Sequence, residues 1–174
     1  MTNRFLTAAL LTQVAWVWAC SSHSTQSSEP APVPTGIPSL SGLDDATRQS
    51  IELACIMQKG QGPVAYGRCL NEQVNALRSS PGIPSLSGLD AATRQSIELA
   101  CIEQKTHGPV AYGSCLNKQI NALRSSPGIP SLSSLDDATR QSIELACIEQ
   151  KTQGPVAYGK CLRAQLRSIG IQPR

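Results

Sequence analysis

The sequence predicts an all-α chain in which a signal peptide and a disordered tether precede three tandem helical hairpins, each stapled by one disulfide. The first observation is an internal repeat, because residues 43–77 recur as 89–123 and, shortened and altered at the end, as 135–167. A fixed period of this size is typical of repeat arrays. The second observation is that two cysteines recur in every repeat, 46 residues apart from copy to copy, as Cys55, Cys101 and Cys147 and as Cys69, Cys115 and Cys161.

Residues 1–19 predict a secretory signal peptide. Arg4 supplies a positive charge, and the mostly apolar stretch that follows is shorter than the ~18 apolar residues expected of a spanning helix. The stretch Val17-Trp18-Ala19-Cys20 resembles the lipobox of bacterial lipoproteins, in which a small residue precedes the cysteine that is lipidated and becomes the mature N-terminus. This resemblance implies a lipid on Cys20 that holds the protein at a membrane.

The cysteine count supports the same role for Cys20. The chain has seven cysteines, and the repeats use six of them as two per copy. An odd cysteine in an exported chain otherwise needs a separate explanation. The alternative is ordinary cleavage after Ala19, which leaves Cys20 as a plain thiol on a soluble secreted or periplasmic protein.

Residues 20–35 are predicted to be the lipidated cysteine and a disordered tether. The segment is rich in Ser and Pro and has almost no large apolar residues, so it cannot bury enough surface to fold. At ~3.1 Å per residue in its Pro-rich part, it can reach roughly 40 Å. Cys20 and His23 are not expected to form a metal site on such a segment.

The repeats are assigned to residues 36–81, 82–127 and 128–174, and each opens with Gly-Ile-Pro-Ser-Leu-Ser. The proline lacks an N–H donor and biases the residue before it toward extended backbone, so these openings are predicted to be linkers. Ile37 and Leu40 are expected to tuck against the hairpin. The sequence leaves open whether the units stack as a small solenoid or hang as separate beads.

The first helix of a repeat is predicted to begin at Ser41 and to end near Lys59. Ser41-Gly42-Leu43-Asp44 reads as an Asp variant of the capping box. Gly60-Gln61-Gly62-Pro63 then breaks the helix, and Pro63 can be the first residue of the next helix because that position needs no intrahelical N–H bond.

The second helix carries Tyr66, Leu70, Val74 and Leu77 at helical spacing, so these residues are expected to face the first helix. Gly67 is a poor helix former, and its expected use is to let two backbones approach closely. Tyr66 and its copies Tyr112 and Tyr158 are interpreted as core or rim residues. The alternative is that these rings are exposed stacking platforms.

The spacing of the cysteines predicts one disulfide within each hairpin. Cys55 precedes the turn by roughly 6 Å of helix and Cys69 follows it by roughly 9 Å, so the two lie at similar heights. Six cysteines allow 15 pairings, and the recurring spacing selects the local one. The predicted bonds are Cys55–Cys69, Cys101–Cys115 and Cys147–Cys161.

The composition favours neither an enzyme nor a nucleic-acid binder, and no cofactor is expected. Of the two histidines, His107 occupies a turn position that is glutamine in the other copies, so no catalytic base recurs. The cysteines lack the C-x-x-C spacing of redox and zinc motifs. The formal net charge of +3 is far from the strongly basic balance of nucleic-acid binders.

Lys160, Arg163 and Arg167 form one basic stripe, at positions i, i+3 and i+7 of the last helix. In an exported protein such a stripe is a candidate contact for anionic glycan, lipopolysaccharide or phospholipid. The alternative is an ordinary solvated face.

The repeat resembles a short module of uncharacterised exported bacterial proteins, with the pattern Leu-Ser-x-Leu, Ser-Ile-Glu-x-Ala-Cys, Gly-Pro-x-Ala-Tyr and Cys-Leu-x-x-Gln. In the first repeat these are residues 40–43, 50–55, 62–66 and 69–73. The resemblance implies export and paired cysteines. We therefore expect a lipoprotein of the bacterial cell envelope that serves as a binding or spacer module. Its expected partners are the membrane, through the lipid, and an envelope glycan, lipopolysaccharide or protein. An accessory subunit of an envelope enzyme is the alternative.

Overall fold

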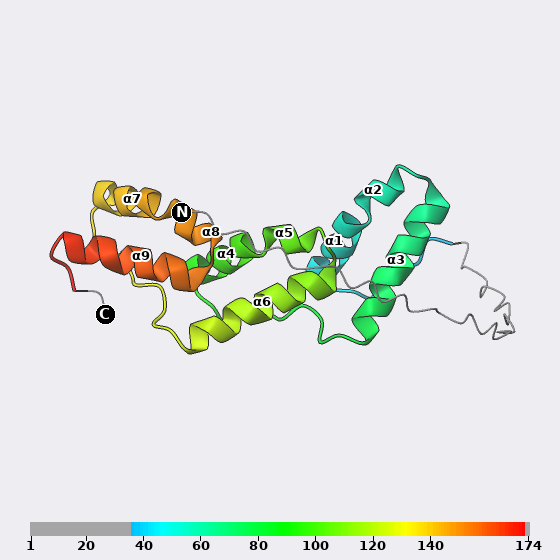
Figure 1. Cartoon of the computed structure of the whole chain (residues 1–174), viewed down its shortest axis with the longest axis horizontal. Coiled ribbons are helices and arrows are strands. Elements are labelled where there is room, and N and C mark those ends of the chain that lie inside the picture. Colours follow the sequence, from blue (N-terminus) through cyan, green and yellow to red (C-terminus); the bar gives the residue numbers. More distant parts are fainter. Residues whose placement is uncertain (1–35, 173–174) are drawn as a thin grey trace, which may run out of the picture. The chain divides into compact units, whose positions relative to one another are not determined.

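The computed structural model describes residues 36–172, and in that part of the chain all regular structure is helical (Figure 1). The predicted all-α class is confirmed. Each repeat contributes three helices: α1 (Asp45–Ala54), α2 (Ile56–Lys59) and α3 (Pro63–Arg78); α4 (Ala91–Ala100), α5 (Ile102–Lys105) and α6 (Pro109–Arg124); α7 (Asp137–Ala146), α8 (Ile148–Thr152) and α9 (Pro155–Ser168). The predictions of a signal peptide, a lipidated Cys20 and a tether concern residues 1–35, which lie outside the described residues.

In each repeat a long helix packs back along two short ones, as the hairpin prediction requires (Figure 1). The predicted disulfides are confirmed, and in each one the two Cα atoms lie 5.7 Å apart. Cα atoms lie ~2.3 Å from a helix axis, so this Cα separation is compatible with the ordinary ~8–10 Å spacing between the axes of packed helices. The bonds are Cys55–Cys69, Cys101–Cys115 and Cys147–Cys161.

Each repeat has its own small apolar core. In the middle repeat the core is built from Ile97, Cys101, Tyr112 and Leu116. Half-buried apolar residues of the preceding linker pack against it, including Leu86. With a core this small, the disulfide is a main source of stability.

The linker prediction for the first repeat is right for Leu40 and wrong for Ile37. Leu40 packs on the core, whereas Ile37 is 57% exposed. The equivalent Ile83 lies beside the start of α1 and is half-buried. Ile83 packs against the core of its own repeat, and Ile37 does not.

The predicted helix start at Ser41 is wrong, because the N-cap residue is Asp44. Leu40 to Leu43 form a turn, closed by the Leu43 N–H bond to the Leu40 carbonyl at 3.1 Å. Asp44 has extended backbone, and its carboxylate accepts the Thr47 N–H at 3.0 Å and the Thr47 hydroxyl at 2.7 Å. These bonds, the hydroxyl bond first, lower the pKa of Asp44.

The predicted continuous first helix is also wrong, because the helix is interrupted at the first cysteine of each repeat. Cys55 has φ −101° and ψ 5°, which ends α1 and separates it from α2. No proline or glycine stands near this position to signal a break. The interruption coincides with the residue that must approach α3 to form the disulfide.

The turn between the two arms agrees with the prediction. Gly62 has φ 103°, a backbone conformation that only glycine adopts without strain, and Pro63 is the first residue of α3. This turn recurs almost unchanged in the other repeats, where the glycines have φ 102° and 109°.

Gly67 and its copies permit a close backbone contact as predicted, but the partner is the repeat's own linker and not the first helix. A Cβ added to Gly67 would lie 3.1 Å from the Gly36 carbonyl oxygen. At Gly113 the corresponding distance, to the Gly82 carbonyl oxygen, is 2.5 Å.

We expect Gly113→Ala to destabilise the protein despite the better helix propensity of alanine. The propensity gain is about 1 kcal/mol, whereas the new methyl group collides with backbone that cannot rotate away. Overpacking of this kind costs about 1–3 kcal/mol. Urea unfolding followed by circular dichroism measures the difference. Gly67→Ala is the matched control, with a smaller expected loss because its contact is looser, and equal midpoints for both variants would contradict this account.

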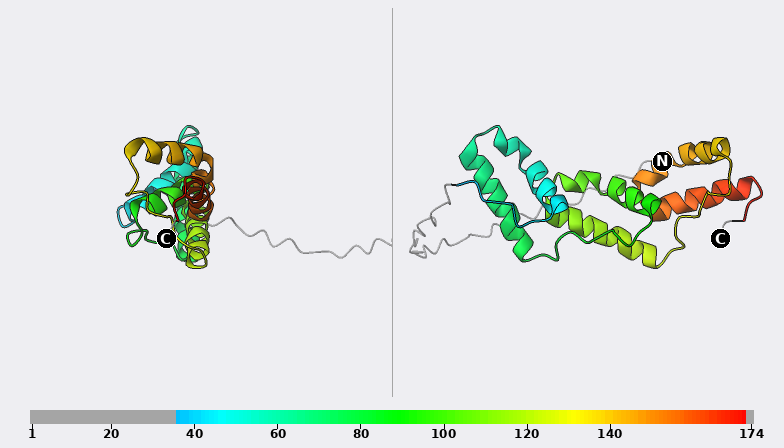
Figure 2. Two further views of the ribbon diagram at one scale, coloured as in Figure 1. Left: turned by 90° about the vertical axis from the view of Figure 1, so that its left-hand side faces the viewer. Right: turned by 180° about the vertical axis from the view of Figure 1, so that it is seen from behind.

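The three hairpins stack, which decides between the solenoid and the beads. Helix α1 contacts α5 and α6 of the next repeat, and α4 contacts α8 and α9. The long helices also contact one another, α3 with α6 and α6 with α9. The right-hand view in Figure 2 shows the three hairpins one after another.

Candidate functional site

Each junction between repeats joins two different surfaces, which we name by their residues in the first junction. The receiving face is the surface of repeat 1 around Gln49, Ser50 and Gln73. The turn face is the surface of repeat 2 around Lys105 and Gly108. The Ser50 hydroxyl donates to the Lys105 carbonyl at 3.1 Å, and the Lys105 ammonium donates to Gln49 Oε1 at 3.3 Å. A Cβ on Gly108 would lie 2.1 Å from Gln73 Oε1, so the turn is pressed against that side chain.

The second junction repeats this geometry. The Ser96 hydroxyl donates to the Lys151 carbonyl at 2.9 Å, and the Lys151 ammonium donates to Gln95 Oε1 at 2.7 Å. The same ammonium lies 5.5 Å from the centre of the Tyr158 ring, within cation–π range. The junction is therefore a built interface that recurs with the sequence period.

A cleft lies beside each junction, between the start of one repeat's first helix and the linker of the next repeat. The first cleft has a volume of about 490 Å³ and the second about 550 Å³. The residue types that line the two clefts are identical. The first cleft is lined by Asp44, Ala46, Ile83, Pro84, Ser85, Leu86, Ser87, Arg94, Glu98, Tyr112 and Leu116, and the second by the residues 46 positions further on.

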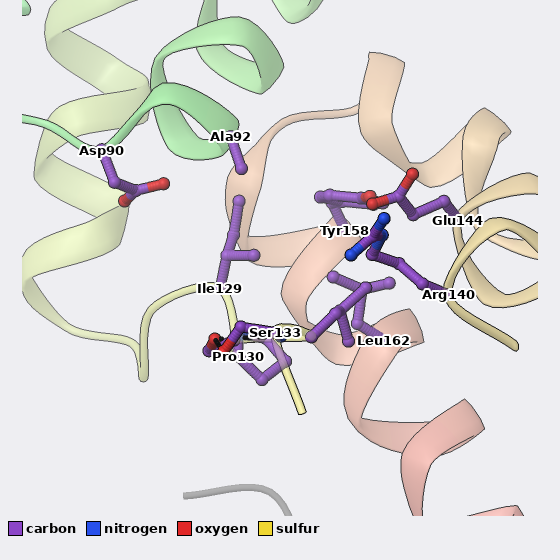
Figure 3. A pocket seen from close by; sticks show the side chains of 11 residues that line it. Asp90, Ala92, Ile129, Pro130, Ser133, Arg140, Glu144, Tyr158 and Leu162 are labelled. Carbon is purple, nitrogen blue, oxygen red and sulfur yellow. Dashed lines mark hydrogen bonds between the residues drawn. The ribbon is translucent and has the colours of Figure 1, made fainter. Parts of the chain in front are cut away.

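The cleft combines an apolar floor with a few polar groups. Figure 3 shows Arg140, Glu144 and Tyr158 grouped on one side of the second cleft, with Asp90 across from them and Ile129 between. The lining holds no histidine and no cysteine. A mostly apolar surface with a few convergent polar groups is typical of a binding site, and this set supplies no nucleophile paired with a base.

The tyrosine in each cleft is held in its neutral form. Burial raises the pKa of Tyr112, and the negative charge of Glu98 raises it further. Burial and then Glu144 raise the pKa of Tyr158 in the same way. Both phenols therefore stay protonated well above neutral pH and can donate a hydrogen bond into the cleft. The prediction of core or rim tyrosines is confirmed for these two.

The clefts differ in the residue behind the arginine. Arg140 is paired with the Asp137 carboxylate at 2.5 Å. In the first cleft the equivalent acid is replaced by Ala91, and Arg94 instead donates to the Leu89 carbonyl at 3.2 Å. Arg94 therefore has no carboxylate ion-pair partner among residues 36–172, although Asp44 and Glu98 also line the first cleft.

The structure divides the predicted basic stripe. Lys160 and Arg167 are exposed, but Arg163 is half-buried and its guanidinium donates to the Gly128 carbonyl at 2.6 Å. The equivalent positions in the other repeats are asparagine. Arg163 therefore serves to hold its own linker, which leaves two free cations for an anionic surface.

We expect this division to appear in binding and stability measurements. Lys160→Gln with Arg167→Gln should lower retention on lipopolysaccharide beads without changing the unfolding midpoint. Arg163→Gln should lower the free energy of unfolding by about 1.5 kcal/mol, the low end of the range for a lost hydrogen bond from a charged group, and leave most of the retention. Retention should also fall as salt rises, since surface fields are screened over ~8 Å at physiological ionic strength. Loss of retention in Arg163→Gln alone would contradict this assignment.

The clefts were not predicted from the sequence. Their polar residues recur with the period, but a helix surface at this spacing also fits an ordinary solvated face. Only the stacking of repeats places Asp44 and Ala46 opposite the next linker. A cleft formed by two repeats can be inferred only once it is known that the repeats stack on one another.

Comparison of the chain with protein-family models, with curated proteins and with solved structures gives no significant match. Within residues 36–172, no group of three or more His, Cys, Asp or Glu side chains is placed to hold a metal ion. The same part of the chain has no helix of the length and apolarity needed to span a membrane.

Proposed function

We propose that the protein is an exported lipoprotein of the bacterial cell envelope, anchored through Cys20, whose stacked repeats bind an envelope ligand in the clefts between them. The observation that carries the binding part is the recurrence of one cleft, with identical lining residues, at both junctions. The three disulfides support an oxidising compartment and hence export. The anchoring part rests on the lipobox resemblance and the leftover cysteine.

The lining limits the class of ligand. An apolar floor with an arginine, a glutamate and a phenol suits a group that has an apolar face and hydrogen-bonding edges, such as a sugar ring or an extended peptide. Two clefts with the same lining residue types on one array suit a ligand that itself repeats, because binding at one cleft raises the effective concentration at the other. An envelope glycan, lipopolysaccharide or an envelope protein fits these terms.

Substitutions in the clefts test the binding proposal. The chain is immobilised and probed separately with purified peptidoglycan fragments, lipopolysaccharide and envelope protein extract. Arg94→Gln combined with Arg140→Gln should weaken the binding of one of these probes at least tenfold. Arg48→Gln is the matched control, because Arg48 has the same place in repeat 1, where no preceding repeat forms a cleft. Equal binding by all variants, or binding by none including the parent, would remove the cleft proposal.

A spacer is the second candidate, and the stacking supports it, because a stacked array holds its far end away from the anchor better than beads do. Replacing the cleft arginines leaves a spacer intact. If the variants with replaced cleft arginines complement a deletion of the protein as well as the wild type does, and no ligand is detected, the spacer is favoured.

The anchor is tested separately. Labelling with a fatty-acid analogue should mark the wild-type chain and not Cys20→Ala. Equal label in both would leave the alternative of a soluble secreted or periplasmic protein, with Cys20 as a plain thiol.

A further inference from the structure

The two ends of the array carry the two halves of the internal junction. Within residues 36–172, repeat 3 presents a receiving face that no other repeat covers, formed by Gln141, Ser142 and Gln165. In the same part of the chain, repeat 1 presents a turn face that no other repeat covers, around Lys59 and Gly62. Each of these residues is the same type as its counterpart in the internal junctions.

Exposure measures how far these end surfaces are uncovered. Ser50 and Ser96 are fully buried under the next repeat, whereas the equivalent Ser142 is exposed. Leu145 is 73% exposed, against 37% for Leu99. A hollow of about 330 Å³ lies in this end of repeat 3, lined in part by Ser142 and Gln165.

The turn face of repeat 1 is uncovered in the same way. Pro109 and Pro155 are fully buried against the preceding repeat, but Pro63 is exposed. Lys59 is exposed as well, whereas Lys105 is half-buried. The backbone of the free turn is nevertheless already in the docked form, because Gly62 has φ 103° and Gly108 has φ 102°.

The positions at which repeat 1 departs from its copies do not alter this face. Gly60 and Gln61 replace Thr106 and His107, and all four residues are exposed. Terminal units of solenoids usually carry a polar outer face that stops further stacking. This array retains the interface residues at both ends instead.

We infer that the protein associates head to tail with a second copy of itself, the turn face of repeat 1 in one molecule docking on the receiving face of repeat 3 in the next. The contact is heterologous, so it leaves one free face of each kind on every dimer and allows longer chains to grow. The hydrogen bonds expected across it are those of the internal junctions, from the Ser142 hydroxyl to the partner's Lys59 carbonyl and from the partner's Lys59 ammonium to Gln141. This association is independent of the proposed ligand.

The affinity between separate copies is expected to be weak. Repeats joined by a short linker meet at an effective concentration on the order of millimolar, whereas separate chains must also lose translational and rotational freedom on association. Self-association is therefore to be sought at concentrations up to about 1 mM.

Sedimentation equilibrium of the complete chain tests the inference, with Cys20→Ser as the parent so that neither a lipid nor a spare thiol contributes. The mass of the parent should rise with concentration beyond that of a dimer. Ser142→Asp spoils the receiving face and Pro63→Asp spoils the turn face, and each should stay monomeric. Ser114→Asp, an exposed serine on neither face, is the control and should associate like the parent.

A mixture of the two defective variants distinguishes head-to-tail contact from any symmetric one. The intact turn face of Ser142→Asp should dock on the intact receiving face of Pro63→Asp and give dimers that do not grow further. Circular dichroism confirms that both variants are folded. A parent that stays monomeric up to about 1 mM, variants that associate as the parent does, or a mixture that stays monomeric would each overturn the inference.

Discussion

Removing the middle disulfide, as Cys101→Ala with Cys115→Ala, should lower the free energy of unfolding by about 3 kcal/mol. The bond closes a loop with a sequence separation of 14, and a cross-link over such a loop is worth about 3 kcal/mol in the chain-entropy account. Cys101 is also fully buried in the four-residue core of its repeat, so packing is lost with the bond.

Because the repeats stack, the loss of stability should depend on which repeat loses its disulfide. The middle repeat contacts both neighbours, through α1 with α5 and α6 and through α4 with α8 and α9. In an array that depends on nearest-neighbour interfaces, loss of the middle unit removes two interfaces, whereas loss of an end unit removes one. The same double substitution in the last repeat, Cys147→Ala with Cys161→Ala, should therefore have a smaller effect.

Urea unfolding followed by circular dichroism measures both effects. The wild-type chain should unfold in one transition, and the middle variant should show a lower midpoint with a broader or split transition. Equal midpoint shifts for the middle and last pairs would indicate that the repeats unfold as independent beads, against the contacts seen between them.

The repeat period, the hairpin and the disulfides could be predicted from the sequence because their signals are local. A cysteine four residues before a helix end and another six residues after the next helix start are constrained by helix geometry alone. The Gly62-Pro63 turn is specified by the two residues whose backbone preferences build it.

The errors arise where a residue's partner is not local. Ser41 and Asp44 are both residue types that can act as a helix N-cap. Residues Leu40 to Leu43 form a turn, so the helix begins after Asp44 and not at Ser41 as predicted. The break at Cys55 has no breaker residue and coincides with the disulfide that joins the two arms of the hairpin.

The junctions and clefts could not be predicted from the sequence either, because their residues meet partners in another repeat. Ser50 and Lys105 look like solvent residues on their own helices, and they become interface residues only when two repeats meet. In near-identical copies the recurrence of such residues carries little information, because too few positions have changed to separate interface from surface.

Ser96→Asp should uncouple the second and third repeats and destabilise the array by about 3–5 kcal/mol, the range expected when a charge is left buried without a partner. Ser96 is fully buried and its hydroxyl donates to the Lys151 carbonyl. A carboxylate at this place has no hydrogen to donate and faces a carbonyl oxygen at the end of α8, where the helix dipole is negative.

The sequence supplies its own control for this effect. Ser142 has the same place in the last repeat, within the same local sequence, but no repeat covers it. Ser142→Asp should therefore leave the free energy of unfolding within about 0.5 kcal/mol of the wild-type value, as surface substitutions usually do. Because the two variants share residue type, helix and neighbours within the repeat, the difference between them isolates the inter-repeat contact. Similar midpoints for Ser96→Asp and Ser142→Asp would show that burial at the junction contributes nothing, and the stacked arrangement would lose its main energetic support.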